Sequence, residues 1–395
     1  MSNYANDRLA LYTFSELISF VQRYTNLQLR YANPLKLADI YFDLFPNERT
    51  TPFWTNPCDD KRHLAIWSTT KHYLCNHAPK ILIVGPQKTG TTALYTFLNL
   101  NPLFKSARMS REDFEEVQFF NDKHYARGSD WYFSRFAGAN ANPNEAIYFD
   151  KSATYFDDSK VPERASNLLP NARIIMLLVD PADRAYSWYQ HMKAHGDIIA
   201  NGLSFDQLIL DARDDISLVE NRTGKSNKIE PSTNPFENAS SMAAIRQLRN
   251  RCIHPGFYAQ HLISWLEHYS SRQIIIIDGQ WFKYNPAAVM NRLQLLLGVR
   301  DPIDYNEILA FDSRKGYFCP LDTLAGNRTR CLGKSKGRKY EPMSEQVRHY
   351  LNRLYLSQNR QLAHLLNDIG QPLPTWLDAA LDSVAQLASA SDRNL

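Results

Sequence analysis

Short runs of apolar residues at regular intervals are the clearest pattern in this chain. Residues 81–84 are four apolar residues in a row, and further strand candidates occupy residues 147–152, 172–180 and 273–279. Uninterrupted apolar strands are typical of parallel sheets that are buried on both faces. Apolar residues at helical spacing follow the first run and predict a helix that starts near Gly90. The alternation of strands and helices predicts an α/β fold with a central parallel sheet covered on both sides.

Capping residues indicate where other helices begin and end. Residues 181–195 have helical sequence followed by Gly196, a typical helix stop. Asn285 and Pro286 are a favourable start for a helix that is expected to run to Leu297. A last amphipathic helix is expected at residues 344–369.

Composition divides the chain into two parts. Residues 14–44 predict two short helices ahead of the core, and residues 46–58 are a loop rich in Pro, Asn and Thr. We therefore expect an N-terminal helical and loop extension at residues 1–78 and the main domain at residues 79–395. Within that domain, the long polar stretch at residues 197–249 is predicted to be a surface insertion.

The first strand runs directly into a turn rich in Gly and Thr, residues 85–92. At such a junction the backbone N–H groups and the positive end of the helix dipole face an anion, and Lys88 adds a full charge. Gly85 and Gly90 allow a tight turn, and three threonine hydroxyls are further donors. The turn predicts a phosphate site, although an ordinary Gly- and Thr-rich loop has the same composition. In the P-loop of NTPases the Lys follows the second Gly, whereas here Lys88 precedes it.

Three other segments gather polar groups in patterns that suit chemistry. Residues 110–120 place four acids beside three Phe on an expected helix, which also fits an ordinary solvated face. Residues 331–340 place four cations among glycines, which suits phosphate capture, a polyanion patch or plain solvent exposure. One face of the helix at 181–195 carries a cation, a hydroxyl and two imidazoles, those of Arg184, Ser187, His191 and His195. An ordinary exposed polar face would have the same pattern.

Charge and length narrow the class of protein only slightly. The chain has 395 residues, and its 45 Lys and Arg nearly balance 41 Asp and Glu, for a net charge of +4. This balance is compatible with a polyanionic or a neutral partner. With 44% hydrophobic residues, the chain can build one large α/β domain or two smaller ones. No apolar run is long enough to span a bilayer and the first ten residues are polar, so the chain as given is expected to be soluble, without signal or anchor.

The five cysteines lack the C-x-x-C spacing of a zinc or redox site, so no metal is expected. Cys319 and Cys331 bracket a short polar segment and could close it as a disulfide, which would imply an oxidising compartment. Three sequons agree with such a compartment and mark candidate glycosylation sites: Asn221, Asn238 and Asn327.

Three stretches, residues 85–95, 181–191 and 331–340, resemble the sulfotransferase domain of the heparan sulfate N-deacetylase/N-sulfotransferases. These enzymes use 3′-phosphoadenosine 5′-phosphosulfate (PAPS), and the resemblance covers about residues 57–376. It implies a P-loop-like three-layer fold in which the first strand, loop and helix bind the 5′-phosphosulfate. Members of the family are anchored in the Golgi membrane, act in its lumen and carry a deacetylase domain. Residues 3–44 are too short for a deacetylase, so we expect a fragment, a short isoform or a single-domain relative.

The resemblance also assigns roles to individual residues. It implies that Glu116 is the catalytic base, that His191 is a site histidine and that the usual disulfide joins Cys319 to Cys331. Phe318 stands where the family has Trp and would stack on adenine with less area, while Asp180 stands where Asn is usual. Ser187 and Arg338 would hold the 3′-phosphate. The remaining cofactor contacts expected in the 5′ loop, the helix at 181–195 and the late basic loop are Lys88, Thr89, Gly90, Thr91, Thr92, Arg184, Ser335, Lys336, Gly337, Lys339 and Tyr340.

The implied reaction transfers a sulfuryl group from PAPS to the free amine of glucosamine units in heparan sulfate or heparosan, and it releases PAP. Glu116 would accept the proton of the amine, and Lys88, Lys336 and His191 would stabilise the leaving phosphate. No metal and no nucleic acid partner is expected. Two rival interpretations stay open, a P-loop kinase that uses ATP and a non-catalytic heparan-binding module based on the late basic loop.

Overall fold

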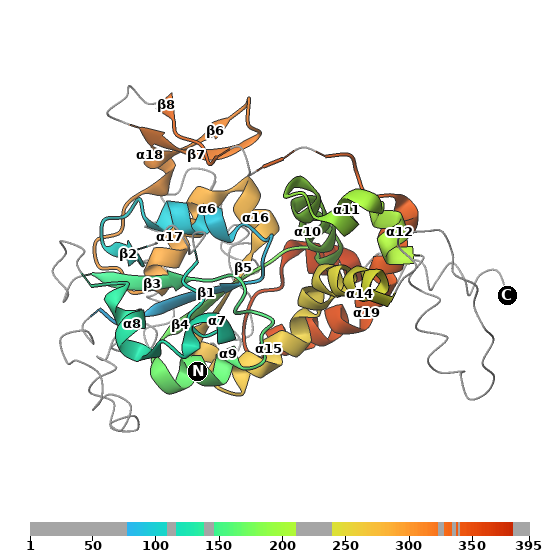
Figure 1. Ribbon diagram of the computed structural model, residues 1–395. Coiled ribbons are helices and arrows are strands. Elements are labelled where there is room, and N and C mark those ends of the chain that lie inside the picture. Colours follow the sequence, from blue (N-terminus) through green and yellow to red (C-terminus); the bar gives the residue numbers. More distant parts are fainter. Residues whose placement is uncertain are drawn as a thin grey trace, which may run out of the picture.

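The computed structural model describes residues 77–108, 116–137, 146–210, 239–322, 328–333, 337–338 and 340–381. The centre of this part of the chain is a five-stranded parallel sheet in the order β2-β3-β1-β4-β5 (Figure 1). Its strands are β1 (Ile81–Gly85), β2 (Phe104–Ser106), β3 (Ile147–Lys151), β4 (Arg173–Leu178) and β5 (Ile274–Asp278). The predicted α/β fold with a central parallel sheet is confirmed, and β2 is a strand that the apolar pattern did not reveal.

Both faces of the sheet are covered, which explains the uninterrupted apolar strands. Ile81 and Ile83 of β1 pack into one hydrophobic cluster, whereas Leu82 and Val84 pack into another on the opposite face. The first cluster is closed by helices α6 (Thr91–Leu98), α16 (Gly279–Tyr284), α17 (Pro286–Leu296) and α18 (Tyr305–Ile308). The second is closed by α8 (Gly128–Ser134), α9 (Val161–Leu168), α15 (Tyr258–Leu266) and the last turns of α19 (Glu345–Asp368). The result is a three-layer arrangement.

A third hydrophobic cluster lies beside the sheet, between helices (Figure 1). It joins the first half of α19 to α10 (Pro181–Ala194), α11 (Ile198–Gly202), α12 (Phe205–Leu210) and α14 (Ala239–Ile253). The prediction of a surface insertion at residues 197–249 is therefore wrong for its described part. Phe205, Leu208 and Leu248 are buried in this cluster, because their helices pack on α10 and α19. Residues 211–238 lie outside the described part of the chain.

A small antiparallel sheet lies beyond α6 and α16 (Figure 1). Its strands are β6 (Leu309–Asp312), β7 (Tyr317–Asp322) and β8 (Arg328–Thr329). The sequence predicted only a polar segment between Cys319 and Cys331, because such short strands carry too few residues for a clear alternation. A disulfide joins Cys319 of β7 to Cys331, as predicted, across a Cα–Cα distance of 4.8 Å.

The helices expected to begin at Asn285–Pro286 and at residue 344 are confirmed. The Asn285 side chain accepts a hydrogen bond from the backbone N–H of Ala288, and Ser344 caps α19 through the N–H of Val347. By contrast, the described end of the expected helix at 110–120, residues 116–120, is not helical. Among the described helices, none combines the length and apolar character needed to cross a membrane.

Candidate active site

The turn between β1 and α6 has the shape that the sequence predicted for an anion-binding loop. Gly85 has a φ of +115°, and a Cβ there would lie 2.3 Å from the carbonyl oxygen of Ala153, so only glycine fits. Gly90, with φ +106°, precedes the first turn of α6. The hydroxyl of Thr89 donates to the carbonyl of Pro86 at 2.8 Å and closes the loop. The loop thus leads directly into the N-terminus of α6, the positive end of the helix dipole, which favours an anion.

This loop forms one wall of an open cavity of about 900 Å³. Lys88 lines the cavity in a left-handed conformation, with φ 73°, which is uncommon for a residue with a side chain. All five predicted loop residues lie on the cavity wall: Lys88, Thr89, Gly90, Thr91 and Thr92. Lys88 and the three threonines of the loop therefore border one space.

Glu116 lines the same cavity, on the segment that leads to α7 (Asp122–Tyr125). Its Oε1 lies 3.2 Å from Nζ of Lys151, at the end of β3, and its Oε2 accepts a hydrogen bond from Nε2 of Gln118 at 3.3 Å. The side chain of Lys151 is only 2% exposed, and its Nζ lies 5.6 Å from the centre of the Tyr95 ring. The ion pair holds the Glu116 carboxylate at the wall of the cavity. Sequence reasoning missed Lys151, although a lysine at the end of an apolar strand was a visible signal.

Helix α10 supplies a third wall and starts at a side-chain cap. Asp180 accepts hydrogen bonds from the N–H groups of Ala182 and Asp183, at 2.8 and 3.1 Å. This carboxylate therefore caps the start of the helix and does not line the cavity. Arg348 of α19 forms an ion pair with it at 3.4 Å.

The polar face predicted on α10 divides between the cavity and the core. Ser187, His191 and His195 line the cavity, and the two imidazole rings lie 4.1 Å apart. Arg184 does not line it: its side chain is 1% exposed, and its guanidinium donates to the carbonyl of Cys252 on α14. Helical spacing placed all four on one face, but Arg184 is in the first turn, where the helix is packed against its neighbours.

Residues from β7 and the late basic loop complete the cavity. Phe318, Gly337, Arg338 and Tyr340 line it. Tyr186 of α10 holds this segment, because its hydroxyl donates to the carbonyl of Glu341 at 2.8 Å and its ring lies 5.3 Å from that of Tyr340.

Gly337 has a φ of +62°, and a Cβ there would lie 2.4 Å from the ring of Tyr317, so the loop can approach β7 only with glycine at this position. The other predicted residues of this loop, Ser335, Lys336 and Lys339, lie outside the described residues.

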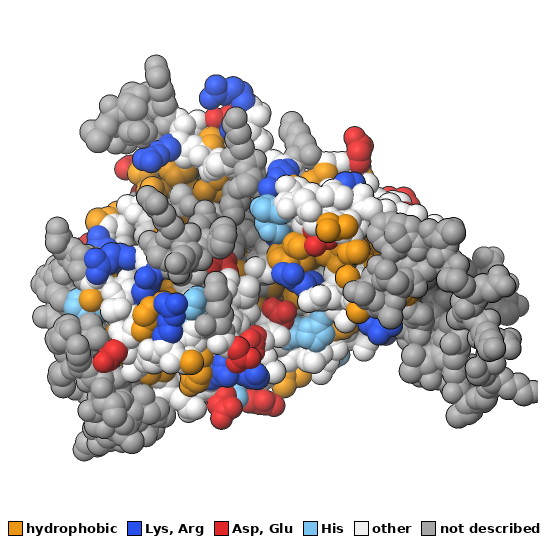
Figure 2. Space-filling view, viewed as in Figure 1, with side chains coloured by type: hydrophobic (Ala, Val, Ile, Leu, Met, Phe, Trp, Pro, Cys, Tyr) orange, Lys and Arg blue, Asp and Glu red, His pale blue; other side chains and the backbone are white. Residues whose placement is uncertain are grey.

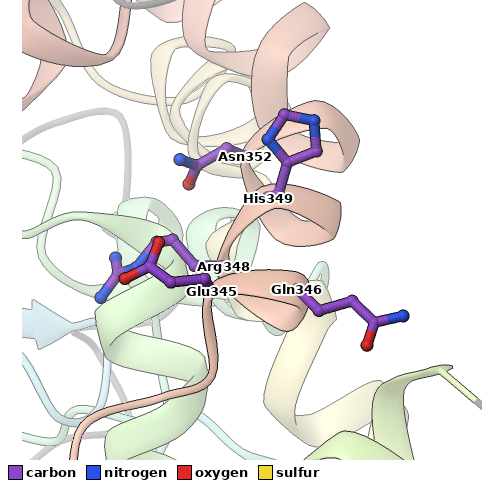
Figure 3. Close-up of a pocket in the computed structure, with 5 residues that line it drawn as sticks. All are labelled: Glu345, Gln346, Arg348, His349 and Asn352. Atoms are coloured by element: carbon purple, nitrogen blue, oxygen red, sulfur yellow. The ribbon is translucent and has the colours of Figure 1, made fainter.

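Basic side chains also lie next to this end of the molecule, where Figure 2 shows Lys and Arg over the small antiparallel sheet. Lys315, in the turn between β6 and β7, is exposed and lines the cavity. A separate hollow of about 510 Å³ lies at the start of α19 and contains none of the predicted site residues (Figure 3). In the part of the chain that the structure describes, no group of three or more His, Cys, Asp or Glu side chains is arranged to hold a metal ion.

The fold and the cavity define an α/β protein with a P-loop-like strand, loop and helix that border the cavity. Residues 78–362 match the family model described as "Sulfotransferase domain", and the chain belongs to this family. The chain is also similar to bifunctional heparan sulfate N-deacetylase/N-sulfotransferases. It is 47% identical to form 2 of Bos taurus over 377 residues and 46% identical to the Drosophila melanogaster protein over 389 residues, each covering 95% of this chain.

This chain covers only part of the length of these relatives. The chain spans 39% of the bovine protein and 34% of the Drosophila protein. The same holds for form 1 of Homo sapiens, which is 46% identical over 377 residues and of which 39% is covered. Among solved structures, a sulfotransferase from Alicyclobacillus acidocaldarius aligns with 76% of this chain and 98% of its own, at 19% identity and a TM-score of 0.48.

Proposed function

We propose that this chain transfers a sulfuryl group from PAPS to the free amine of glucosamine units in heparan sulfate, and that PAP is the second product. The proposal rests on membership of the sulfotransferase family and on the similarity to heparan sulfate N-deacetylase/N-sulfotransferases. The observation that carries it is that Lys88 and its loop line the same cavity as Glu116. A cofactor-binding group and a candidate base thus face one reaction space.

The residues of the cavity suit PAPS in number and kind. Lys88 and the threonines after it offer a charge and hydroxyl donors for the 5′-phosphosulfate, at the N-terminus of a helix. Ser187 and Arg338 line the cavity and are our candidates for the 3′-phosphate, and Phe318 offers a ring for the adenine. A volume of about 900 Å³ has room for a mononucleotide cofactor such as PAPS and part of a sugar. When bound, PAPS supplies the sulfuryl group.

The side chains around Glu116 suit transfer to an amine. An amine attacks only when it is neutral, so a carboxylate must accept its proton as the new N–S bond forms, and Glu116 can do this. Lys88 and His191 lie on the cavity wall, where their charge and hydrogen bonds would stabilise the leaving phosphate. Donors placed in this way are worth roughly 3–4 kcal/mol each. Lys336 is proposed for the same task from the resemblance alone.

Two further assignments follow from the family. We propose that residues 79–395 act as the transferase domain, with residues 1–78 as an extension in front of it. We also propose that the protein works in the Golgi lumen, where the disulfide between Cys319 and Cys331 would persist. The three sequons would be glycosylated there; Asn221, Asn238 and Asn327 lie outside the described residues.

The test follows radiolabelled sulfate from PAPS to defined polysaccharides. We expect label on N-desulfated heparan and none on the matched N-acetylated polymer, which has no free amine. Label on both polymers would mean that a hydroxyl is the acceptor. Calorimetric titration with PAP and ATP tests the two rival functions. Preference for ATP over PAP would support a kinase, and binding of neither would support a heparan-binding module.

A further inference from the structure

A buried carboxylate lies behind the wall of the cavity that carries Glu116. Asp150 is on β3, next to Lys151, and is fully buried. Its Oδ1 accepts a hydrogen bond from the hydroxyl of Ser152 at 2.8 Å. Its Oδ2 accepts hydrogen bonds from the hydroxyls of Tyr132 at 2.9 Å and Tyr155 at 3.0 Å. Three hydroxyl hydrogens are therefore directed to one carboxylate, and none of these side chains lines the cavity.

Two of these hydroxyls also accept hydrogen bonds from the segment that carries Glu116. The backbone N–H of Gln118 donates to Ser152 Oγ at 2.9 Å, and the N–H of Phe119 donates to Tyr155 Oη at 2.7 Å. A hydroxyl accepts well from a defined direction when its own hydrogen is fixed elsewhere, and Asp150 fixes both. The carboxylate thus orders the backbone two and three residues after Glu116.

The conformation of this segment shows why it needs such support. Residues 116–120 are neither helix nor strand, so their N–H groups have no regular backbone partners. Gln118 has a φ of 50°, which is uncommon for any residue other than glycine. The segment therefore does not hold its shape by local preference, and the hydroxyls of Ser152 and Tyr155 supply the missing partners.

We propose that Asp150 is a positioning residue, which acts through Ser152 and Tyr155 to hold Glu116 at the cavity. This inference rests on the proposed function, in which Glu116 accepts the proton of the acceptor amine. Proton transfer and attack depend on the placement of the base, and a displacement of about 1 Å can cost on the order of 10² in rate. The hydrogen bonds of the Asp150 network are consequently part of what sets turnover, although its residues do not touch the substrate.

Two variants each remove one hydroxyl of the network. Ser152→Ala takes away the acceptor of the Gln118 N–H, and Tyr155→Phe takes away the acceptor shared by the N–H groups of Phe119 and Phe120. For each we expect kcat to fall roughly 10- to 100-fold, with little change in the KM for PAPS and in the affinity for PAP. The matched control is Tyr355→Phe, which removes another fully buried hydroxyl, bonded to the carbonyl of Ile253 at 2.9 Å in the third cluster. The control should keep wild-type kcat.

Combination with Glu116→Gln separates positioning from a general loss of structure. If Ser152 acts through Glu116, then Ser152→Ala should cost nothing further once Glu116 is Gln. An equal loss in both backgrounds would overturn the proposal, as would wild-type kcat in both Ser152→Ala and Tyr155→Phe while Glu116→Gln is inactive. In that second case the proposed base would stand. Full activity of Glu116→Gln would instead refute the base, and with it the positioning role. PAP affinity and the melting temperature report whether each variant is folded.

Discussion

Replacing Glu116 by Gln is the most informative single change, because it keeps the side-chain volume and removes the charge. In the structure the carboxylate pairs with Lys151 at 3.2 Å, and that lysine is 2% exposed. Removing one partner of a buried ion pair typically costs about 3–5 kcal/mol. The amide oxygen of Gln can still accept a hydrogen bond from Lys151, so the loss of stability should fall below that range. The variant is therefore expected to fold with a lower melting temperature.

Turnover should suffer much more than cofactor binding. The amide cannot accept the proton of the amine, and general-base catalysis typically contributes roughly 10²–10⁴ in rate. PAP affinity should stay near the wild-type value, since the cofactor is expected on the Lys88 side of the cavity. The assay pairs PAP titration with transfer of radiolabelled sulfate to N-desulfated heparan, both well below the lowered melting temperature.

The control is the neighbouring acid. Glu115→Gln makes the same chemical change one residue earlier, in the part of the chain outside the described residues. If Glu115 and Glu116 belong to an ordinary solvated acidic face, both variants should have normal turnover. Normal turnover of Glu116→Gln, or a loss only in Glu115→Gln, would refute the assignment of the base while leaving the fold and the cofactor untouched.

Three further predictions use other parts of the site. Lys88→Ala should lose about 3 kcal/mol of transition-state stabilisation, which lowers the transfer rate roughly 10²-fold. A variant that keeps more than about a tenth of the wild-type rate would contradict this. Non-reducing mass mapping of lumenally expressed protein should find Cys319 linked to Cys331, and replacing both by Ser should cost about 3 kcal/mol of stability for a loop of this length, measured by urea unfolding. Burial raises the pKa of Asp150 to about 6, against an ordinary 3.8, so the folded state binds this proton more tightly than the unfolded state. The stability contributed by this proton is fully present below about pH 4 and is lost as the pH rises through about 6. Between pH 4 and pH 7 the free energy of unfolding of the wild type should therefore fall by about 3 kcal/mol relative to that of Asp150→Asn. A difference between the two proteins that does not vary with pH would refute the pKa shift.

The elements that carry the 5′ loop could be predicted from the sequence alone. The apolar run at residues 81–84, the glycines at 85 and 90 and the helical spacing that follows are all local signals, and β1 and α6 appear where they were expected. The same is true of α17 and α19, whose starts depend on the side chains of Asn285 and Ser344. Local signals succeed here because capping, periodicity and tight turns involve residues within a few positions of one another.

The arrangement of the site required the tertiary structure. Helical spacing placed Arg184 beside Ser187, but spacing gives only the direction of a side chain around the helix, and packing against α14 decided which of the two reaches the cavity. The pairing of Lys151 with Glu116 spans 35 positions, and the bond from the Gln118 N–H to Ser152 spans 34. Contacts at that separation arise only when β3 takes its place beside β1. The proposed cofactor loop could therefore be predicted from local sequence, whereas the support of the proposed base depends on the fold.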